Sequence, residues 1–267
     1  MNTNRKITST ELTTRITKHI EQLARETDAA RVSEEMLRYL EACSKFHHYS
    51  LFNMWLLLMT KPQAKLVAGY RKWQSMNRYV RKGEHGIPIL APMVKTEEGE
   101  GEEGQKVLHG FKIVYVFDIS QTEGEPLPEP PDWKSPEKNA VLAEKLIMFA
   151  ESRGIKVSEQ ELKGEVQGVS MGGVIQIAPE AGTATLIHEI AHELMHRRED
   201  RPASKAVREM EAEAVAFVVT RHFGLDGVDS PNYLALHGSD SGAILEHLER
   251  IRTTVAEIIL GVEKDLC

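Results

Sequence analysis

Apolar residues recur along the chain with two different periods, which separate predicted helices from predicted strands. Between Leu12 and Leu23 they follow helical spacing, so residues 8–27 are predicted to form an amphipathic helix. Residues 111–117 are β-branched or aromatic almost throughout and predict the strongest strand. Further helices are predicted at residues 33–40, 50–59, 136–153, 201–223 and 242–262, and shorter strands at 86–92, 155–157 and 174–178. The pattern indicates an α+β protein.

Two polar segments interrupt this pattern. Residues 97–104 are acidic and glycine-rich and are expected to form a loop between two strands. Residues 122–132 contain four prolines and four acids, which is typical of a semi-rigid linker. We therefore expect two domains, at residues 1–125 and 137–267, joined by a linker at 126–136.

The net charge of −7 is unevenly distributed. Residues 1–95 carry a net charge of +8, residues 96–132 a net charge of −8 and the remainder −7. A basic front half suggests a polyanionic partner for that half alone. Cys43 and Cys267 are expected to be unpaired thiols in a reducing compartment. No signal peptide or membrane span is evident, so we expect a cytoplasmic protein without a membrane partner.

The main chemical motif is His188-Glu189-Ile-Ala-His192 in an apolar helical frame. Histidines four residues apart share one helix face and can reach one metal ion. Glu189 is the expected catalytic residue, a general base that takes a proton from water at the metal. The strand 174–178 precedes this helix, and we expect its edge to pair with an extended substrate. The alternative is a buried helix with two hydrogen-bonded histidines and an exposed glutamate.

A third metal ligand is expected from the next helix. Glu209 and Glu213 are four residues apart and share one face. We assign Glu209 as the third ligand of one Zn²⁺ per chain, with Glu211 as the alternative ligand. Glu213 and His196 are assigned to orient the ligand histidines. A solvated acidic face is the alternative for the two glutamates, and simple packing is the alternative for His196. Candidates for stabilising an oxyanion are Tyr233 and His237.

The pattern H-E-x-x-H-x-x-x-H followed by E-x-x-A-E-x-V-A resembles the ImmA/IrrE group of gluzincin-like metallopeptidases. It resembles the C-terminal domain of ArdC-type antirestriction proteins still more. The resemblance covers roughly residues 140–262, and the matching zinc and catalytic positions are His188, Glu189, His192 and Glu209. It implies a zincin-like metalloendopeptidase domain. Val215-Ala216 replaces the usual Phe-Ala, a departure that we expect to affect packing and not chemistry.

Basic and aromatic residues alternate between Lys61 and Lys95, with eight Lys/Arg against one acid. Such a pattern suits single-stranded nucleic acid, because cations contact phosphates and exposed rings stack on unpaired bases. The candidate DNA contacts are Arg71, Lys72, Trp73, Arg78, Arg81 and Lys82. The alternative is that Tyr70 and Trp73 are core residues and the cations a solvated face.

Several segments of the front half resemble the N-terminal domain of the same ArdC-type proteins. They are Gly69–Trp73, Val80–Glu84, Gly86–Leu90 and Val116–Gly124, together with Asn53 and the following Leu56–Leu58 run. The resemblance covers roughly residues 8–125 and implies a mixed helix and antiparallel-sheet domain that binds single-stranded DNA.

Together these observations predict a DNA-binding zinc metallopeptidase of the antirestriction type, carried by a mobile genetic element or its host. The protein or peptide substrate is unknown. One alternative is a non-proteolytic single-stranded DNA-binding antirestriction protein, whose zinc domain is structural or docks a protein. The other is a regulatory protease that acts on a repressor.

Overall fold

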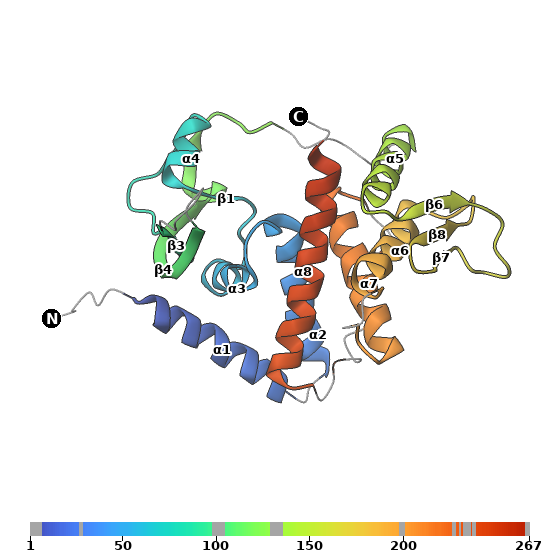
Figure 1. Cartoon of the computed structure of the whole chain (residues 1–267). Helices are drawn as coiled ribbons and strands as arrows, with labels where there is room; N and C mark the ends of the chain where they lie inside the picture. The colour runs from blue at the N-terminus through green and yellow to red at the C-terminus, as the bar shows by residue number, and fades with distance from the viewer. Residues whose placement is uncertain are drawn as a thin grey trace. The chain divides into compact units, whose positions relative to one another are not determined.

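The computed structural model describes residues 7–26, 29–97, 105–128, 136–197, 201–225, 228–229, 231, 236 and 239–264. They form a mixed α+β fold of helices and mainly antiparallel sheets (Figure 1). Unit 1 comprises Met1–Glu21 and Tyr49–Pro128, and unit 2 comprises Gln22–His48 and Glu129–Cys267. This division differs from the predicted one in residues 22–48, which belong to the second compact unit.

The described part of unit 1 contains one three-stranded sheet, a short second ladder, three α-helices and one 3₁₀ helix. Its elements are most of α1 (Ser9–Arg25), α3 (Leu51–Thr60), β1 (Val67–Gly69), α4 (Tyr70–Ser75), β2 (Arg78–Val80), β3 (Ile87–Glu97), β4 (Gln105–Asp118), the 3₁₀ helix η1 (Ile119–Gln121) and β5 (Thr122–Gly124). The sheet has the antiparallel order β1–β4–β3, and β2 pairs with β5. In Figure 1 α4 lies beside β1 and β4.

The core of unit 1 lies between α3 and one face of this sheet. Ile87, Ile89 and Val116 of the sheet are buried, as are the large side chains of α3. Asn53 of α3 reaches across this core, where its side chain donates to the Leu90 carbonyl at 2.9 Å and accepts from the Leu90 N–H at 2.8 Å. Because a buried amide needs such partners, these bonds fix α3 against β3.

Unit 2 combines five helices with a small mixed sheet. Its elements are α2 (Ala29–Phe46), α5 (Pro136–Ser152), β6 (Lys156–Glu159), β7 (Gly168–Ser170), β8 (Val174–Ile177), α6 (Thr183–Met195), α7 (Lys205–His222) and α8 (Ser241–Glu263). The strand order is β6–β8–β7, with β8 parallel to β6 and antiparallel to β7. Figure 1 shows α6 beside this sheet and α7 beside α6.

Helix α7 is buried along most of its length because it contacts α2, α6 and α8. Its alanines at positions 212, 214 and 216 are buried and allow neighbouring helices to approach closely. His222 near its end ties α2 and α8 to it, with Nδ1 2.8 Å from the Ser44 carbonyl and Nε2 2.9 Å from Glu263. None of the helices among the described residues is long and apolar enough to cross a membrane.

Most predicted elements are present with shifted ends. The predicted short helical turn at residues 71–73 is the six-residue helix α4, and β4 begins at Gln105, earlier than the predicted strand at 111–117. β2 and β5 were not predicted as strands. Residues 98–104 of the predicted acidic loop and 129–135 of the predicted linker lie outside the described residues, as does Cys267. Cys43 is buried as a free thiol.

Candidate metal centre

Two helices of unit 2 bring the histidine motif and a downstream glutamate together. α6 begins after Gly182, and its helical spacing places His188 and His192 on one face. α7 begins after Ser204, whose hydroxyl caps the helix by accepting from the Val207 N–H at 3.4 Å. Because α7 packs on α6, Glu209 in its second turn faces both imidazoles.

The three side chains have the spacing of a metal site. Nε2 of His188 lies 3.0 Å from Nε2 of His192. Oε2 of Glu209 lies 3.5 Å from the first nitrogen and 3.4 Å from the second. Donors bound at about 2.0–2.2 Å to one tetrahedral Zn²⁺ are roughly 3.3–3.6 Å from each other. The two separations from Glu209 fall in this range, and the histidine nitrogens at 3.0 Å are slightly closer together. Two nitrogens and one carboxylate oxygen therefore suit a divalent ion that keeps one position open.

Both imidazoles are held in the neutral form that a metal ligand requires. Burial lowers the pKa of His188, and the negative charge of Glu209 offsets this only in part. Burial, together with the neighbouring His188, lowers the pKa of His192 to about 4. Neither side chain therefore has to lose a proton near pH 7 before it binds a metal.

Glu189 is buried beside this site, with 7% of its surface exposed. Burial raises its pKa to about 7, and the negative charge of Glu209 adds to the rise, whereas the backbone N–H of Ser170 opposes it. Gly168 of β7 lies so close that a Cβ there would be 2.8 Å from Cγ of Glu189. The absence of a side chain at residue 168 therefore lets β7 approach the carboxylate. Both histidines and Glu189 line one cleft of about 710 Å³.

A buried hydrogen-bonded chain supports His192 from behind. Its Nδ1 lies 2.9 Å from Nδ1 of His196, whose Nε2 lies 2.8 Å from Oε2 of Glu211. Glu211 is fully buried, and its Oε1 lies 2.7 Å from Nδ1 of His247 and 3.3 Å from Nε of Arg250. Burial alone would raise the pKa of Glu211, but the bonds to the two histidines and the charge of Arg250 outweigh it and lower the pKa.

This arrangement changes the roles predicted for two glutamates of α7. Glu211, the alternative ligand, faces away from the metal-binding atoms and contacts His196. Glu213, assigned to orient a ligand histidine, is half-buried and lines a neighbouring cavity with His188 and Glu189. Among the described residues, the carboxylate hydrogen-bonded to this histidine chain is that of Glu211. The sequence analysis already expected His196 to orient a ligand histidine. Such a histidine needs a carboxylate partner of its own, and this need could have pointed to Glu211.

Glu193 was missed by the sequence analysis, although it anchors one wall of the cleft. Its Oε1 accepts hydrogen bonds from the Ser170 hydroxyl and the Gly172 N–H, both at 2.7 Å. Its Oε2 accepts from the Gly173 N–H at 2.6 Å. A buried carboxylate with three donors holds the β7–β8 turn against α6. The sequence did contain one indication of this role, because Glu193 is a charged residue inside an apolar helical segment.

The strand edge beside the metal site belongs to β7, which corrects the prediction for residues 174–178. β8 is the central strand of its sheet and is paired on both sides. The Ala178 N–H donates to the Gln167 carbonyl, and the Met171 N–H donates to the Val174 carbonyl, both at 2.9 Å. In an antiparallel ladder alternate residues face outward, so the backbone groups of Gly168 and Ser170 lie on the outer edge.

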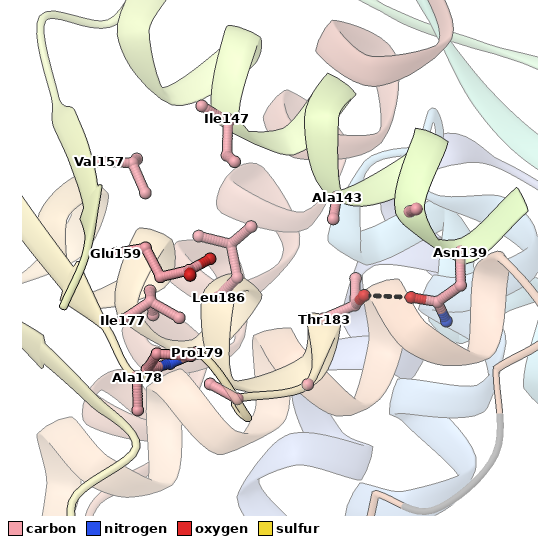
Figure 2. A pocket seen from close by; sticks show the side chains of 13 residues that line it. Asn139, Ala143, Ile147, Val157, Glu159, Ile177, Ala178, Pro179, Thr183 and Leu186 are labelled. Atoms are coloured by element: carbon pink, nitrogen blue, oxygen red, sulfur yellow. Dashed lines mark hydrogen bonds between the residues drawn. The ribbon is translucent and has the colours of Figure 1, made fainter. Parts of the chain in front are cut away.

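A second cavity lies at the N-terminal end of α6. Figure 2 shows its largely apolar wall, with Ile147, Val157 and Ile177, and the Glu159 side chain extended toward Leu186. At one end the Thr183 hydroxyl donates to Oδ1 of Asn139. Its volume is about 370 Å³, and among the described residues it shares no lining residue with the metal cleft.

Trp73 is not available for base stacking, which corrects its assignment as a DNA contact. Its side chain is fully buried, and Nε1 donates to the Phe117 carbonyl at 2.9 Å. The ring therefore fastens α4 to β4. Its neighbours Arg71 and Lys72 are exposed, as the DNA-binding prediction requires.

The other cations assigned to DNA differ in how they are engaged. Arg78 donates to the Thr122 hydroxyl at 2.9 Å and to the Glu125 carbonyl, so it fastens β2 to β5. Arg81 donates to Glu84 at 3.0 Å and to the Ser120 carbonyl. Lys82 is exposed. The oxyanion candidates Tyr233 and His237 lie outside the described residues.

Exposed aromatic rings occur elsewhere in unit 1. Phe111 and Tyr115 are four residues apart on β4 and therefore share one face of the sheet. They are 48% and 54% exposed and lie opposite Pro92 and Pro88 of β3. Tyr70 at the start of α4 is 49% exposed. The solvent face of the sheet, not Trp73, thus presents aromatic surface.

Comparison with known families gives a match over the front of the chain. Residues 6–117 match the model of the N-terminal domain of anti-restriction factor ArdC. This segment, less than half of the chain, is therefore similar to the N-terminal domain of ArdC. The ArdC match covers the sheet and α4 of unit 1, and it ends before the metal centre.

Other matches cover more of the chain than residues 6–117. An uncharacterized protein of Bacillus anthracis is 23% identical over 87% of this chain, and the chain spans about half of that relative, 48% of its length. The crystal structure of antirestriction ArdC protein from the R388 plasmid, metal-free, has 18% identity and a TM-score of 0.45, covering 81% of this chain and 86% of that one. Its Mn(II)-bound structure has 19% identity and a TM-score of 0.43, covering 84% and 97%.

Proposed function

We propose that this protein is a DNA-binding antirestriction protein whose unit 2 is a zinc-dependent metallopeptidase. The observation that carries the proposal is the triangle of His188, His192 and Glu209, with Glu189 buried beside it. A structural zinc site has four protein ligands, whereas three ligands and an open position are typical of a catalytic one. The similarity of residues 6–117 to the ArdC N-terminal domain supports the antirestriction role and single-stranded DNA as the partner.

The residues of the cleft have distinct parts in hydrolysis. His188, His192 and Glu209 would hold the metal, which supplies Lewis acidity to polarise a carbonyl and to make water more acidic. Glu189 takes a proton from the water whose oxygen attacks the carbonyl carbon. It then gives that proton to the leaving nitrogen as the carbon–nitrogen bond breaks, which yields a carboxylic acid and an amine. The second proton of the water passes from the acid to the amine, so the final products are a carboxylate and an ammonium group. A carboxyl group with a pKa of about 7 suits both transfers near neutral pH.

Metal analysis tests the site independently of activity. We expect wild-type protein dialysed against Zn²⁺ to retain about one equivalent, because its three donors already have the required spacing. Glu209→Gln should lose most of this metal, since an amide is a much weaker ligand than a carboxylate. Mn²⁺ is measured in parallel to establish which ion is preferred. Glu151→Gln on the exposed face of α5 is the matched control. A wild-type protein that binds neither ion would contradict the proposal.

DNA binding in unit 1 is tested by removing its exposed rings. Phe111→Ala combined with Tyr115→Ala should weaken binding to oligothymidylate by about tenfold or more, because stacking contributes roughly 1–3 kcal/mol per base. Arg71→Ala with Lys72→Ala should weaken binding and flatten its salt dependence. Met148→Ala with Leu260→Ala removes exposed apolar surface from unit 2 and serves as the control. Gel shifts with single-stranded and duplex DNA provide the measurement, and equal weak binding of both would refute single-strand preference.

Two other functions from the sequence analysis remain as outcomes of these tests. A non-proteolytic DNA-binding protein with a structural or docking zinc domain would bind metal and DNA and keep its antirestriction activity in Glu189→Gln. A regulatory protease would cleave a repressor, and loss of DNA binding would leave that cleavage unchanged. The open coordination position and the buried base beside it favour the catalytic proposal over the first of these.

A further inference from the structure

Four cationic side chains gather in the metal cleft. Arg197 follows the end of α6, and Arg201, Lys205 and Arg208 belong to the start of α7 and the segment before it. All four side chains line the same 710 Å³ cleft as the histidines. The contrast with the surroundings is marked, since residues 133–267 carry a net charge of −7.

Among the described residues, most of this charge is held in place by backbone carbonyls and not by acidic side chains. Arg208 donates to the Pro202 and Ala203 carbonyls at 2.7 and 2.8 Å, and Arg201 donates to the His196 carbonyl at 3.5 Å. Backbone carbonyls fix the position of a guanidinium but leave its full charge. Arg197 lies 3.8 Å from Glu193, whose carboxylate already accepts three hydrogen bonds.

The acids that line this cleft among the described residues already have partners in the site. Glu189 is approached by the Ser170 N–H, and Glu209 faces the two histidines. A bound divalent metal would add further positive charge. The cleft therefore needs negative charge from its substrate, because cations in a concave site concentrate anionic ligands.

The strand β7 also lines this cleft, and it indicates what kind of backbone the substrate has. β7 lines it with Gly168 and Ser170, whose backbone groups lie on the outer edge, and strand addition to such an edge requires an extended polypeptide. Because the Ser170 N–H is directed at Glu189, the Gly168 backbone and the Ser170 carbonyl are the groups that remain for pairing. A nucleic acid has no backbone N–H or carbonyl groups to pair with this edge. Because the cleft has both a strand edge and cationic side chains, a peptide with acidic side chains fits it better as a substrate than a nucleic acid does.

We infer that the cleft selects extended peptide segments that carry Asp or Glu beside the scissile bond, with Arg197, Arg201, Lys205 and Arg208 as the charge-recognition wall. This inference rests on the proposed peptidase function and names its substrate class. Acidic side chains bind the cationic wall while the peptide backbone pairs with β7. The bond to be cleaved is thereby placed between Glu189 and the three metal-binding side chains.

The test uses two pools of short peptides with the same apolar and small residues at alternate positions. One pool carries Asp and Glu at the remaining positions, and the other carries Lys and Arg. Zinc-loaded wild type should cleave the acidic pool at least about tenfold faster, an effect expected from roughly two partly exposed ion pairs. Raising the salt concentration from about 50 to about 500 mM should shrink the difference, because exposed charges are screened.

Variants locate the preference within the molecule. Arg197→Gln with Lys205→Gln should bring the two pools to similar rates while metal content stays unchanged. Lys156→Gln with Lys163→Gln removes the same charge from exposed positions that do not line the cleft, and should keep the preference. Equal cleavage of both pools by wild type, or a preference that survives in the first double variant, would overturn the inference.

A binding measurement separates this inference from the peptidase proposal. Fluorescence anisotropy with zinc-loaded Glu189→Gln reports binding of each pool without turnover. Tighter binding of the acidic pool supports the inference even if wild type cleaves nothing, an outcome that would reject only the peptidase function. Hydrolysis of oligothymidylate in place of peptides, or equal binding of both pools, would reject the acidic-peptide assignment itself.

Discussion

Replacing Glu189 with glutamine should lower the rate of peptide hydrolysis by about 10²–10⁴-fold, the usual contribution of a general base. Glutamine has nearly the same size as glutamate, but its amide cannot take the proton of the attacking water. Neither His188 nor His192 changes, and Glu209 keeps its charge, so metal content should be preserved. The rate of cleavage of the acidic peptide pool and the zinc content of the same sample provide the measurements.

The same substitution should not weaken the fold. Burial raises the pKa of Glu189 to about 7, so the folded protein disfavours the ionised carboxylate. An acid with a raised pKa opposes folding at pH values above its unfolded pKa, where the unfolded chain is ionised. Glutamine removes that opposition, and the free energy of unfolding at pH 7 should stay equal or rise slightly. Glu151→Gln is the control for both measurements, and a peptidase rate equal to wild type in Glu189→Gln would remove Glu189 from the mechanism.

The arrangement of the metal ligands could be predicted because it follows from local geometry. The four-residue spacing of His188 and His192 fixes their common face in any regular helix. The sequence also indicated a second helix with small residues, and α7 does bring Glu209 within 3.5 Å of both imidazole nitrogens. What periodicity could not decide was the rotation of α7 about its axis. That rotation points Glu211 into the buried chain behind His196, where Glu213 had been expected to act.

The errors concern features that depend on contacts between distant residues. Trp73 lies among cations in the sequence, but the carbonyl that accepts its indole N–H belongs to Phe117, 44 residues away. The alternation of basic and aromatic residues therefore predicted the exposed face of α4 with Arg71 and Lys72, but not the buried face with Trp73. In the same way, the strand at 174–178 was predicted correctly as a strand. Its central position depends on pairing with both β6 and β7, which no local pattern specifies.

Glu193 shows a further limit of motif reading. The histidine motif assigns roles to His188, Glu189 and His192 only. Glu193, which directly follows the motif, has no role in it. Its three hydrogen bonds to the β7–β8 turn arise because this turn folds back on α6. The wall that carries the strand edge therefore depends on a residue adjacent in sequence to a ligand. Sequence reasoning predicted which side chains lie together at the site but not the structure that shapes its cleft.

The largest effect on stability is expected from Glu211→Gln. The carboxylate has no solvent exposure and contacts His196, His247 and Arg250. Removing one member of a buried charged network costs roughly 3–5 kcal/mol, because the remaining partners keep their desolvation cost without compensation. The free energy of unfolding, measured by urea denaturation of the metal-free protein, should fall by about this amount. Glu213→Gln, two residues along the same helix and half-buried, should change it by less than about 1 kcal/mol.

The same pair of variants decides which carboxylate supports the metal ligand. When His192 binds a metal through Nε2, its Nδ1–H donates to His196, and Nε2–H of His196 donates to Glu211. Loss of such an outer hydrogen-bond partner typically lowers metal affinity by about 10–100-fold. Competition with a zinc chelator should show this loss in Glu211→Gln under conditions where the protein remains folded. A larger loss in Glu213→Gln would restore the role predicted for that residue, because the chain through His196 would then not be what orients His192.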